Sequence, residues 1–136
     1  MTDRFFLSLD PPRVTGQMKG INFAERRVYT KPQVLEAEAL FAWHLKKHIP
    51  REPLKGAVSL SVTFYFAFSG RGHADGEWKI TKPDTDNLIK VLKDTMTKLR
   101  FWGDDAQVAE ETIRKQWSKI KPGIAIEIAE LGAKGE

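Results

Sequence analysis

The chain gathers aspartates in two close pairs, Asp84 with Asp86 and Asp104 with Asp105. Carboxylates held this close together repel one another unless a cation lies among them. Oxygen ligands of this kind suit Mg²⁺ or Mn²⁺, whereas zinc prefers histidine and cysteine. In a basic protein, the usual substrate of such a metal is a nucleic-acid phosphate. The two pairs therefore predict a metal site for phosphodiester chemistry.

A helical pattern separates the two pairs. Its apolar positions recur at the spacing of one helix face: Leu88, Val91, Leu92, Thr95, Met96 and Leu99. The polar positions lie on the opposite face: Asp86, Lys90, Lys93 and Thr97. Lys90 follows Asp86 by one turn, so its ammonium could stabilise charge on a phosphoryl oxygen. The alternative is an exposed Asp86–Lys90–Asp94 ladder, in which each pair contributes a few tenths of a kcal/mol.

Asp84 and Asp86 lie where the chain enters this helix. An aspartate at a helix start is often only a cap, and the helix dipole favours negative charge there. Two such residues, followed by a second pair, favour a metal site instead. The helix spans roughly 20 Å at 1.5 Å per residue, which leaves Asp104 and Asp105 at its far end. Spacing alone leaves open how Asp105 reaches Asp84 and Asp86.

Composition is that of one globular domain. The 136 residues are 41% hydrophobic and 29% charged, and we expect a single domain over residues 1–136 with a frayed tail at 131–136. The net charge is +4, and the acids cluster around residues 84–111. The remaining surface is therefore more basic than the total suggests, which fits binding of a phosphate backbone. Charge that only keeps the protein soluble is the alternative.

Several other chemistries are excluded by the residues present. The chain has no cysteine, which rules out disulfides and thiolate chemistry. It has no Ser-His-Asp set with a supporting context and no glycine-rich phosphate loop. His44 and His48 are four residues apart, but without an acidic partner they favour packing over metal binding. No signal peptide or apolar span is present, so we expect a cytoplasmic protein with no membrane partner.

The elements predict an α+β fold: a small mixed β-sheet with two α-helices packed on one face. The expected order is strand, hairpin, helix, long strand, loop, helix, strand, strand. Alternating apolar and small residues over 58–68 predict the central strand. The first helix is expected from Thr30 to Ile49, where Pro50 ends it. Gly103 is expected to stop the second helix in a left-handed conformation.

Two segments outside the acidic stretch carry candidate DNA contacts. The segment 13–27 is basic and contains glycines, and the loop 69–81 combines glycines, bases and an aromatic residue. Lys82 flanks the first aspartate pair. The alternatives are a solvated hairpin and a surface loop without a role. The candidates are Arg13, Lys19, Arg26, Arg27, Arg71, Trp78, Lys79 and Lys82.

At these residues the chain resembles the RusA family of Holliday junction resolvases. The resemblance rests on one run: Lys82-Pro83-Asp84-Thr85-Asp86-Asn87-Leu88, then Lys90, Asp94 and Asp104-Asp105-Ala106-Gln107-Val108. The family implies a homodimeric, Mg²⁺-dependent endonuclease that cuts four-way DNA junctions by paired symmetric nicks, with Mn²⁺ as a possible substitute. We therefore expect a metal-activated water to attack the phosphodiester.

The family motif also implies a role for individual residues. Its metal-binding aspartates match Asp84, Asp86 and Asp105, and its essential lysine matches Lys90. Three further family positions are candidates for a supporting role around the metal ligands: Asn87, Asp94 and Asp104.

The chain departs from the family pattern in two places. Pro11 and Pro12 are followed by Arg13 where the family often has asparagine, which bears on DNA contacts of that loop. Thr95-Met96 replaces a common Ala-Leu after Asp94, which touches packing only. Two alternative functions remain: a non-catalytic, structure-selective DNA-binding protein, and a metal nuclease for other branched DNA such as forks or flaps.

Overall fold

A mixed four-stranded sheet forms the centre of the computed structural model, which describes residues 2–13, 19–22, 27–30 and 32–135, with no side chains described for 19–30. The strands lie in the order β1-β6-β4-β5. Their bounds are Thr2–Leu7 for β1, Gly123–Glu130 for β6, Val58–Ala67 for β4 and Val108–Ser118 for β5. β6 pairs antiparallel with β1 and β4, whereas β5 pairs parallel with β4.

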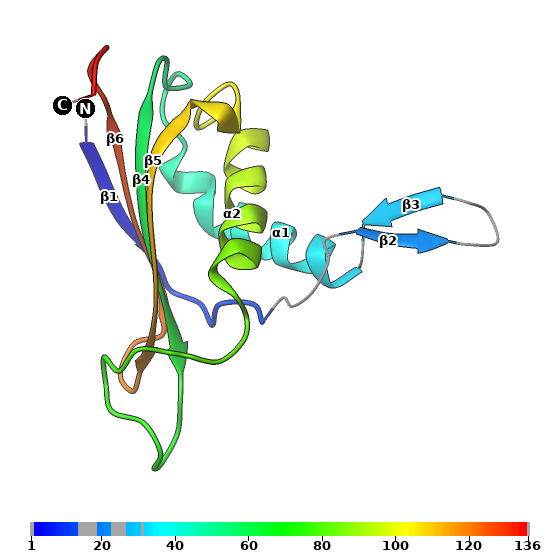
Figure 1. Ribbon diagram of the computed structural model, residues 1–136, viewed down its shortest axis with the longest axis vertical. Helices are drawn as coiled ribbons and strands as arrows, with labels where there is room; N and C mark the ends of the chain where they lie inside the picture. The colour runs from blue at the N-terminus through cyan, green and yellow to red at the C-terminus, as the bar shows by residue number, and fades with distance from the viewer. Residues whose placement is uncertain (1, 14–18, 23–26, 31, 136) are drawn as a thin grey trace.

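β4 is the central strand because its side chains alternate between two environments. Every second residue from Val58 to Phe66 is buried, and the residues between them are half-buried. The buried side faces α1 (Pro32–Leu45) and α2 (Thr85–Lys98), which both cover the same face of the sheet (Figure 1). The predicted α+β fold is confirmed.

A short hairpin stands apart from this sheet (Figure 1). β2 (Lys19–Asn22) and β3 (Arg27–Thr30) pair antiparallel and form a separate two-stranded sheet. The hairpin expected before the first helix is therefore present. Within the part of the chain that the structure describes, no helix is both long and apolar enough to cross a membrane.

Two polar contacts fix the direction of α2 against β5. Lys93 forms an ion pair with Glu111 at 2.8 Å between Nζ and Oε2. Further along β5, Nζ of Lys115 donates to the carbonyl oxygen of Pro83 at 2.7 Å. The helix therefore runs antiparallel to β5. Its start lies beside Lys115, and its end lies near Val108, where β5 begins.

Both helices end differently from the prediction. α1 begins at Pro32, ends at Leu45 and continues as the 3₁₀ helix η1 (Lys46–His48). α2 ends at Lys98, and Arg100, not Gly103, takes the left-handed conformation with φ 68°. The N–H of Arg100 donates to Thr97 O at 3.0 Å, and that of Phe101 to Met96 O at 3.1 Å. This is a Schellman stop, whose hydrogen bonds outweigh the preference for glycine.

Candidate active site

Asp84 occupies the N-cap position of α2 without acting as a cap. Its backbone is extended, with φ −74° and ψ 150°, and its side chain makes no capping hydrogen bond. The side chain is exposed. A capping role would explain this aspartate only if its carboxylate accepted an N–H of the first turn. The alternative of a purely structural cap is therefore wrong for Asp84.

Asp86 and Lys90 extend the same exposed surface along the first turns of α2. Both side chains are exposed, and the apolar stripe beside them is buried from Leu88 to Met96 and half-buried at Leu99, much as the spacing predicts. Among the described residues, no ion pair joins Lys90 to Asp86 or Asp94. The ladder that was the alternative for these side chains therefore contains no ion pair among the described residues, although the Lys90 charge lowers the pKa of Asp94.

Hydrogen bonds from β5 fix the three residues of the chain that precede Asp84. Nζ of Lys115 donates to the carbonyl oxygens of Thr81 and Pro83, each at 2.7 Å. Pro83 is itself buried. This lysine was not among the predicted site residues. The only signal for it in the sequence is a charged residue within a predicted strand, which is usually solvated.

The two aspartates of the second pair, Asp104 and Asp105, make different contacts. Asp104 caps the 3₁₀ helix η2 (Asp105–Gln107): its Oδ1 accepts the N–H of Ala106 at 2.9 Å. Gln107 completes the capping box, because its Oε1 accepts the N–H of Asp104 at 3.0 Å. Asp105 is half-buried, and its carboxylate accepts no hydrogen bond from the described residues. Asp104 therefore stabilises the turn, and Asp105 lies in that turn with its carboxylate free of hydrogen bonds from the described residues.

Gln107 anchors this turn to the chain before β4. Its Nε2 donates to the carbonyl oxygens of Leu54 and Gly56, both at 3.0 Å. Its Oε1 also accepts the N–H of Gly103 at 2.8 Å. One side chain thus makes four hydrogen bonds to two segments of the chain, 54–56 and 103–104. The position of Asp105 follows from this network and from the register in which Val58 pairs with Val108.

Within one chain, α2 separates the two aspartate pairs. Its 14 residues span about 21 Å at about 1.5 Å per residue. The strand measures a similar distance, since the seven steps from Val108 to Lys115 span about 23 Å at about 3.3 Å each. Among the described residues, no three histidine, cysteine, aspartate or glutamate side chains lie close enough to hold a metal together. The open question about Asp105 therefore persists within a single copy.

Asp94, in the middle of α2, lies nearer to Asp105. Its pKa is raised above the usual aspartate range, chiefly by burial and then by the negative charge of Asp105. Glu38 raises the same pKa, while Lys90 and Lys98 lower it. Asp94 and Asp105 thus form an acidic surface toward the end of the helix, distinct from Asp84 and Asp86 at its start. Asn87 lies half-buried beside Asp86.

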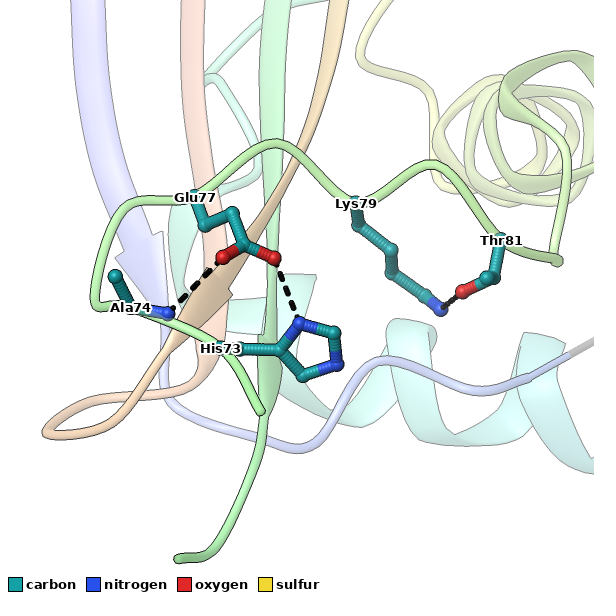
Figure 2. Close-up of polar contacts among 5 residues, drawn as sticks. All are labelled: His73, Ala74, Glu77, Lys79 and Thr81. Carbon is teal, nitrogen blue, oxygen red and sulfur yellow. Dashed lines mark hydrogen bonds and ion pairs between the residues drawn. The ribbon is translucent and has the colours of Figure 1, made fainter. Parts of the chain in front are cut away.

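The loop 69–81 is tied to the sheet and does not extend freely. The N–H of Lys79 donates to Lys115 O at 3.0 Å, and that of Trp117 to Glu77 O at 2.8 Å. Within the loop, Figure 2 shows a contact between His73 and Glu77, whose Nδ1 and Oε2 atoms are 2.7 Å apart. This contact lowers the pKa of Glu77. The loop therefore adds a short edge to β5 beside the start of α2.

The predicted DNA contacts fall into three groups. Four side chains are exposed: Arg13, Arg71, Trp78 and Lys82. Lys79, in contrast, is only 4% exposed, and its Nζ donates to Thr81 Oγ1, so its side chain does not project from the loop. Lys19 and Arg27 lie in β2 and β3, where side chains are not described, and Arg26 lies outside the described residues.

The carboxylates at the two ends of α2 are of the kind that a hard divalent cation prefers, although one copy of the chain does not bring them together. Asp84, Asp86 and Asp105 offer only carboxylate oxygens, and among the described residues none of them has a hydrogen-bond or ion-pair partner for its side chain. Carboxylates without partners are the ligands that Mg²⁺ and Mn²⁺ take. Asp104 is already committed to its cap, so it does not compete for this role.

In this domain, a mixed sheet supports a helix whose first turns carry two exposed aspartates and an exposed lysine. This arrangement fits a small nuclease domain. The chain belongs to the endodeoxyribonuclease RusA family, whose model matches residues 11–129. It is also 36% identical over 137 residues to the crossover junction endodeoxyribonuclease rusA of Lactococcus phage r1t. That alignment covers 96% of this chain and 100% of the phage protein.

Proposed function

We propose that this protein is an endodeoxyribonuclease that resolves four-way DNA junctions with a divalent metal, Mg²⁺ or in its place Mn²⁺. The observation that carries the proposal is the N-cap aspartate that does not cap: Lys115 bonds the carbonyl oxygen of Pro83 just before Asp84, and the Asp84 side chain is exposed and makes no capping hydrogen bond. The family motif falls on the same residues. The basic balance of the chain, +4, suits a DNA substrate.

The proposed chemistry divides between the ligands and Lys90. A divalent ion at the aspartates supplies a Lewis acid and lowers the pKa of water. Lys90 lies one turn from Asp86 on the exposed face, where its ammonium offsets negative charge that develops on the phosphoryl oxygens. Hydrolysis that breaks the bond between phosphorus and O3′ leaves a 5′-phosphate and a 3′-hydroxyl.

Two copies of the chain would complete the site. If two α2 helices lie antiparallel across a two-fold axis, the partner's Asp105 approaches Asp84 and Asp86, which no single copy achieves over about 20 Å. Two such sites match the two-fold symmetry of a four-way junction and its paired nicks. α1 offers apolar surface for contact between copies: Leu35 is 51% and Trp43 74% exposed, beside a groove of about 290 Å³ between α1 and α2.

A cleavage assay tests the enzyme. The protein is incubated with Mg²⁺ and end-labelled four-way junction, fork, flap and linear duplex, with Asp86→Asn in parallel. We expect paired nicks in the junction by the wild type and loss of cutting by at least 100-fold in the variant, as for removal of one group that stabilises charge. Binding without metal-dependent cutting would leave a structure-selective binding protein. Equal cutting of linear duplex, or preferred cutting of forks or flaps, would reject junction resolution.

Mixing two inactive variants tests whether the site is shared between copies. Asp86→Asn and Asp105→Asn are inactive alone but, once subunits exchange, a mixed dimer regains one intact site and nicks one strand. The matched control is Asp84→Asn mixed with Asp86→Asn, which breaks both sites of every mixed dimer. Recovery in the first mixture alone supports the shared site. Equal inactivity of the two mixtures, with exchange verified by mass, would place all three aspartates in one copy.

A further inference from the structure

Two lysine ammonium groups converge on Thr81, three residues before Asp84. Nζ of Lys79 donates to Thr81 Oγ1 at 2.5 Å, and Nζ of Lys115 donates to Thr81 O at 2.7 Å. Figure 2 shows the Lys79 side chain directed along the loop toward Thr81. Lys79 is 4% exposed, and its ammonium lies 4.3 Å from the centroid of the Trp117 ring. The two lysines therefore hold their charges close together beside the candidate active site.

Arg13 adds a third positive charge from the other end of the sequence. Its guanidinium carbon lies 5.3 Å from the ring centroid of Phe66 and 6.0 Å from that of Trp117. The Lys79 ammonium lies over the same two rings, at 5.2 Å from Phe66. Arg13 is exposed, so it forms the outer side of the group. We call Arg13, Lys79 and Lys115 the cationic cluster.

The cationic cluster is electrostatically unfavourable on its own. Lys79 and Lys115 are neighbours across the edge of β5, since the N–H of Lys79 donates to Lys115 O, and like charges in such a pair destabilise a sheet. Burial, Arg13 and Lys115 together lower the pKa of Lys79. Cation–π contacts with Trp117 and Phe66 offset only part of this cost.

The carboxylates of the adjacent loop do not neutralise the cluster. Glu77 pairs with His73 at 2.7 Å, and Asp75 accepts the N–H of Lys119 at 2.9 Å. Among the described residues, no ion pair includes a member of the cationic cluster. Two ammonium groups meet at Thr81, and the Arg13 guanidinium shares the Phe66 and Trp117 rings with Lys79. Positive charges gathered in this way without a carboxylate partner are suited to an anion.

The position of the cationic cluster indicates which kind of anion it would bind. Lys115 also donates to Pro83 O, and Pro83 immediately precedes Asp84. An anion held by Lys79 and Lys115 therefore lies next to the carboxylates that we assign to the metal. We propose that Arg13, Lys79 and Lys115 bind a phosphodiester group of the DNA strand adjacent to the phosphodiester that is cut. This inference rests on the proposed function, and it assigns Lys115 and the buried Lys79 a role in positioning the strand.

Salt-dependent binding tests the proposal without cleavage. The affinity for a fluorescent four-way junction is measured in EDTA at several salt concentrations for the wild type, Lys79→Met and Arg13→Met. Each lost phosphate contact reduces the slope of log K against log salt by about 1, and we expect this in both variants. The matched control is Lys46→Met, an exposed lysine on η1, which should leave the slope unchanged. Unchanged slopes in Lys79→Met and Arg13→Met would overturn the proposal.

A second measurement distinguishes a phosphate contact from a purely structural role. Neutral methylphosphonate linkages replace the phosphodiesters around the cut site one at a time. At one position next to the cut, the affinity of the wild type should fall, and Lys79→Met should cause no further loss there. A variant that only loosens the loop would instead lower the affinity equally at every position, which would reject the proposal. Melting curves identify any unfolded variant; Arg13→Met, at an exposed side chain, then carries the test.

The two proposals fail in different ways. If the wild type does not bind the junction in EDTA with a preference over linear duplex, or does not cut it with Mg²⁺, the proposed function fails. If it binds and cuts while the cluster variants keep the wild-type slope, only the cationic cluster is rejected.

Discussion

The Oδ1 atom of Asp104 accepts a hydrogen bond from the backbone N–H of Ala106 at 2.9 Å. Its sequence neighbour Asp105 has no such bond among the described residues, so two adjacent aspartates have separable effects. We expect Asp104→Ala to lower the free energy of unfolding by about 1 kcal/mol, as for loss of an N-cap, or roughly 4 °C in Tm. Asp105→Asn should leave Tm within about 1 °C and abolish metal-dependent cleavage.

Asp104→Ser is the control for this pair, because serine retains a capping oxygen. It should recover most of the lost stability. Thermal melts and the junction assay, performed on the same three variants, measure both effects. A wild-type Tm in Asp104→Ala, or full cleavage by Asp105→Asn, would contradict the division of roles.

Gln107 joins the segments 54–56 and 103–104 through one amide, so its replacement by glutamate should be destabilising. A carboxylate can still accept the N–H groups of Gly103 and Asp104, but it cannot donate to the carbonyls of Leu54 and Gly56. We expect Gln107→Glu to destabilise by about 2–3 kcal/mol in urea unfolding, since two acceptors lose their donor and face a negative charge. Equal stability of wild type and variant would show that the amide is dispensable.

We expect a substitution at Arg100 to stabilise the protein. It holds φ 68° in the Schellman stop of α2, a conformation that costs a residue with a Cβ about 1 kcal/mol relative to glycine. Arg100→Gly should therefore raise the free energy of unfolding by about 0.5–1 kcal/mol. Arg100→Ala is the matched control, because it removes the charge and keeps the strain. Greater stabilisation by alanine than by glycine would show that charge, not backbone conformation, is the cause.

The sequence predicts helices and strands correctly where one face is buried. It does not predict the end of a helix that is determined by long-range contacts. The alternation in β4 and the stripe of α2 are local signals of burial, so both elements were predicted correctly. Gly103 was the wrong stop because glycine favours a left-handed turn wherever it occurs, whereas the hydrogen bonds from Arg100 and Phe101 to α2 carbonyls select the actual one. Those bonds depend on the packing of Phe101, which is fully buried.

The candidate site was predictable to a similar degree. Periodicity alone placed Asp86 and Lys90 on an exposed surface, and Asp84 was predicted where the chain enters the helix. Lys79 was predicted as a DNA contact, but Lys115 and the meeting of the two lysines could not be predicted, because they depend on an edge pairing between a loop and β5. The place of Asp105 depends on the length of α2 and, in our proposal, on a second copy, neither of which local spacing encodes.

Gly123 begins β6 where no side chain fits. A Cβ at this buried position would overlap the ring of Phe6 and the carbonyl oxygen of Leu7. The ring can turn, but Leu7 belongs to the β1–β6 ladder and cannot move without loss of pairing. We expect Gly123→Ala to destabilise by about 3 kcal/mol, near the upper end for overpacking. Gly132→Ala, which meets no neighbour within 4 Å, is the control, and equal melts of the two variants would contradict the clash.

His48 predicts a pH dependence of stability. Its ring stacks on Phe5 with centroids 4.2 Å apart, and its Nε2 is buried without a hydrogen-bond partner among the described residues. Burial, then the charge of Lys47, lowers its pKa below 6.5, while Asp3 opposes this. The folded pKa of His48 lies below its unfolded value, so the neutral imidazole contributes to the free energy of unfolding. This contribution is fully present above about pH 6.5 and is lost as pH falls through the folded pKa.

His48→Phe keeps an aromatic ring on Phe5 and removes the titration. Between pH 7.5 and pH 5, the wild type should therefore lose more stability than the variant in urea unfolding. His44→Phe is the control, because His44 lies one turn earlier, between Trp43 and Leu45 of α1, and is half-buried. Among the described residues, no buried nitrogen of His44 lacks a partner, so this variant controls for the histidine-to-phenylalanine change itself. If His48→Phe and the wild type lose stability in parallel, the buried imidazole is not the source of the acid sensitivity.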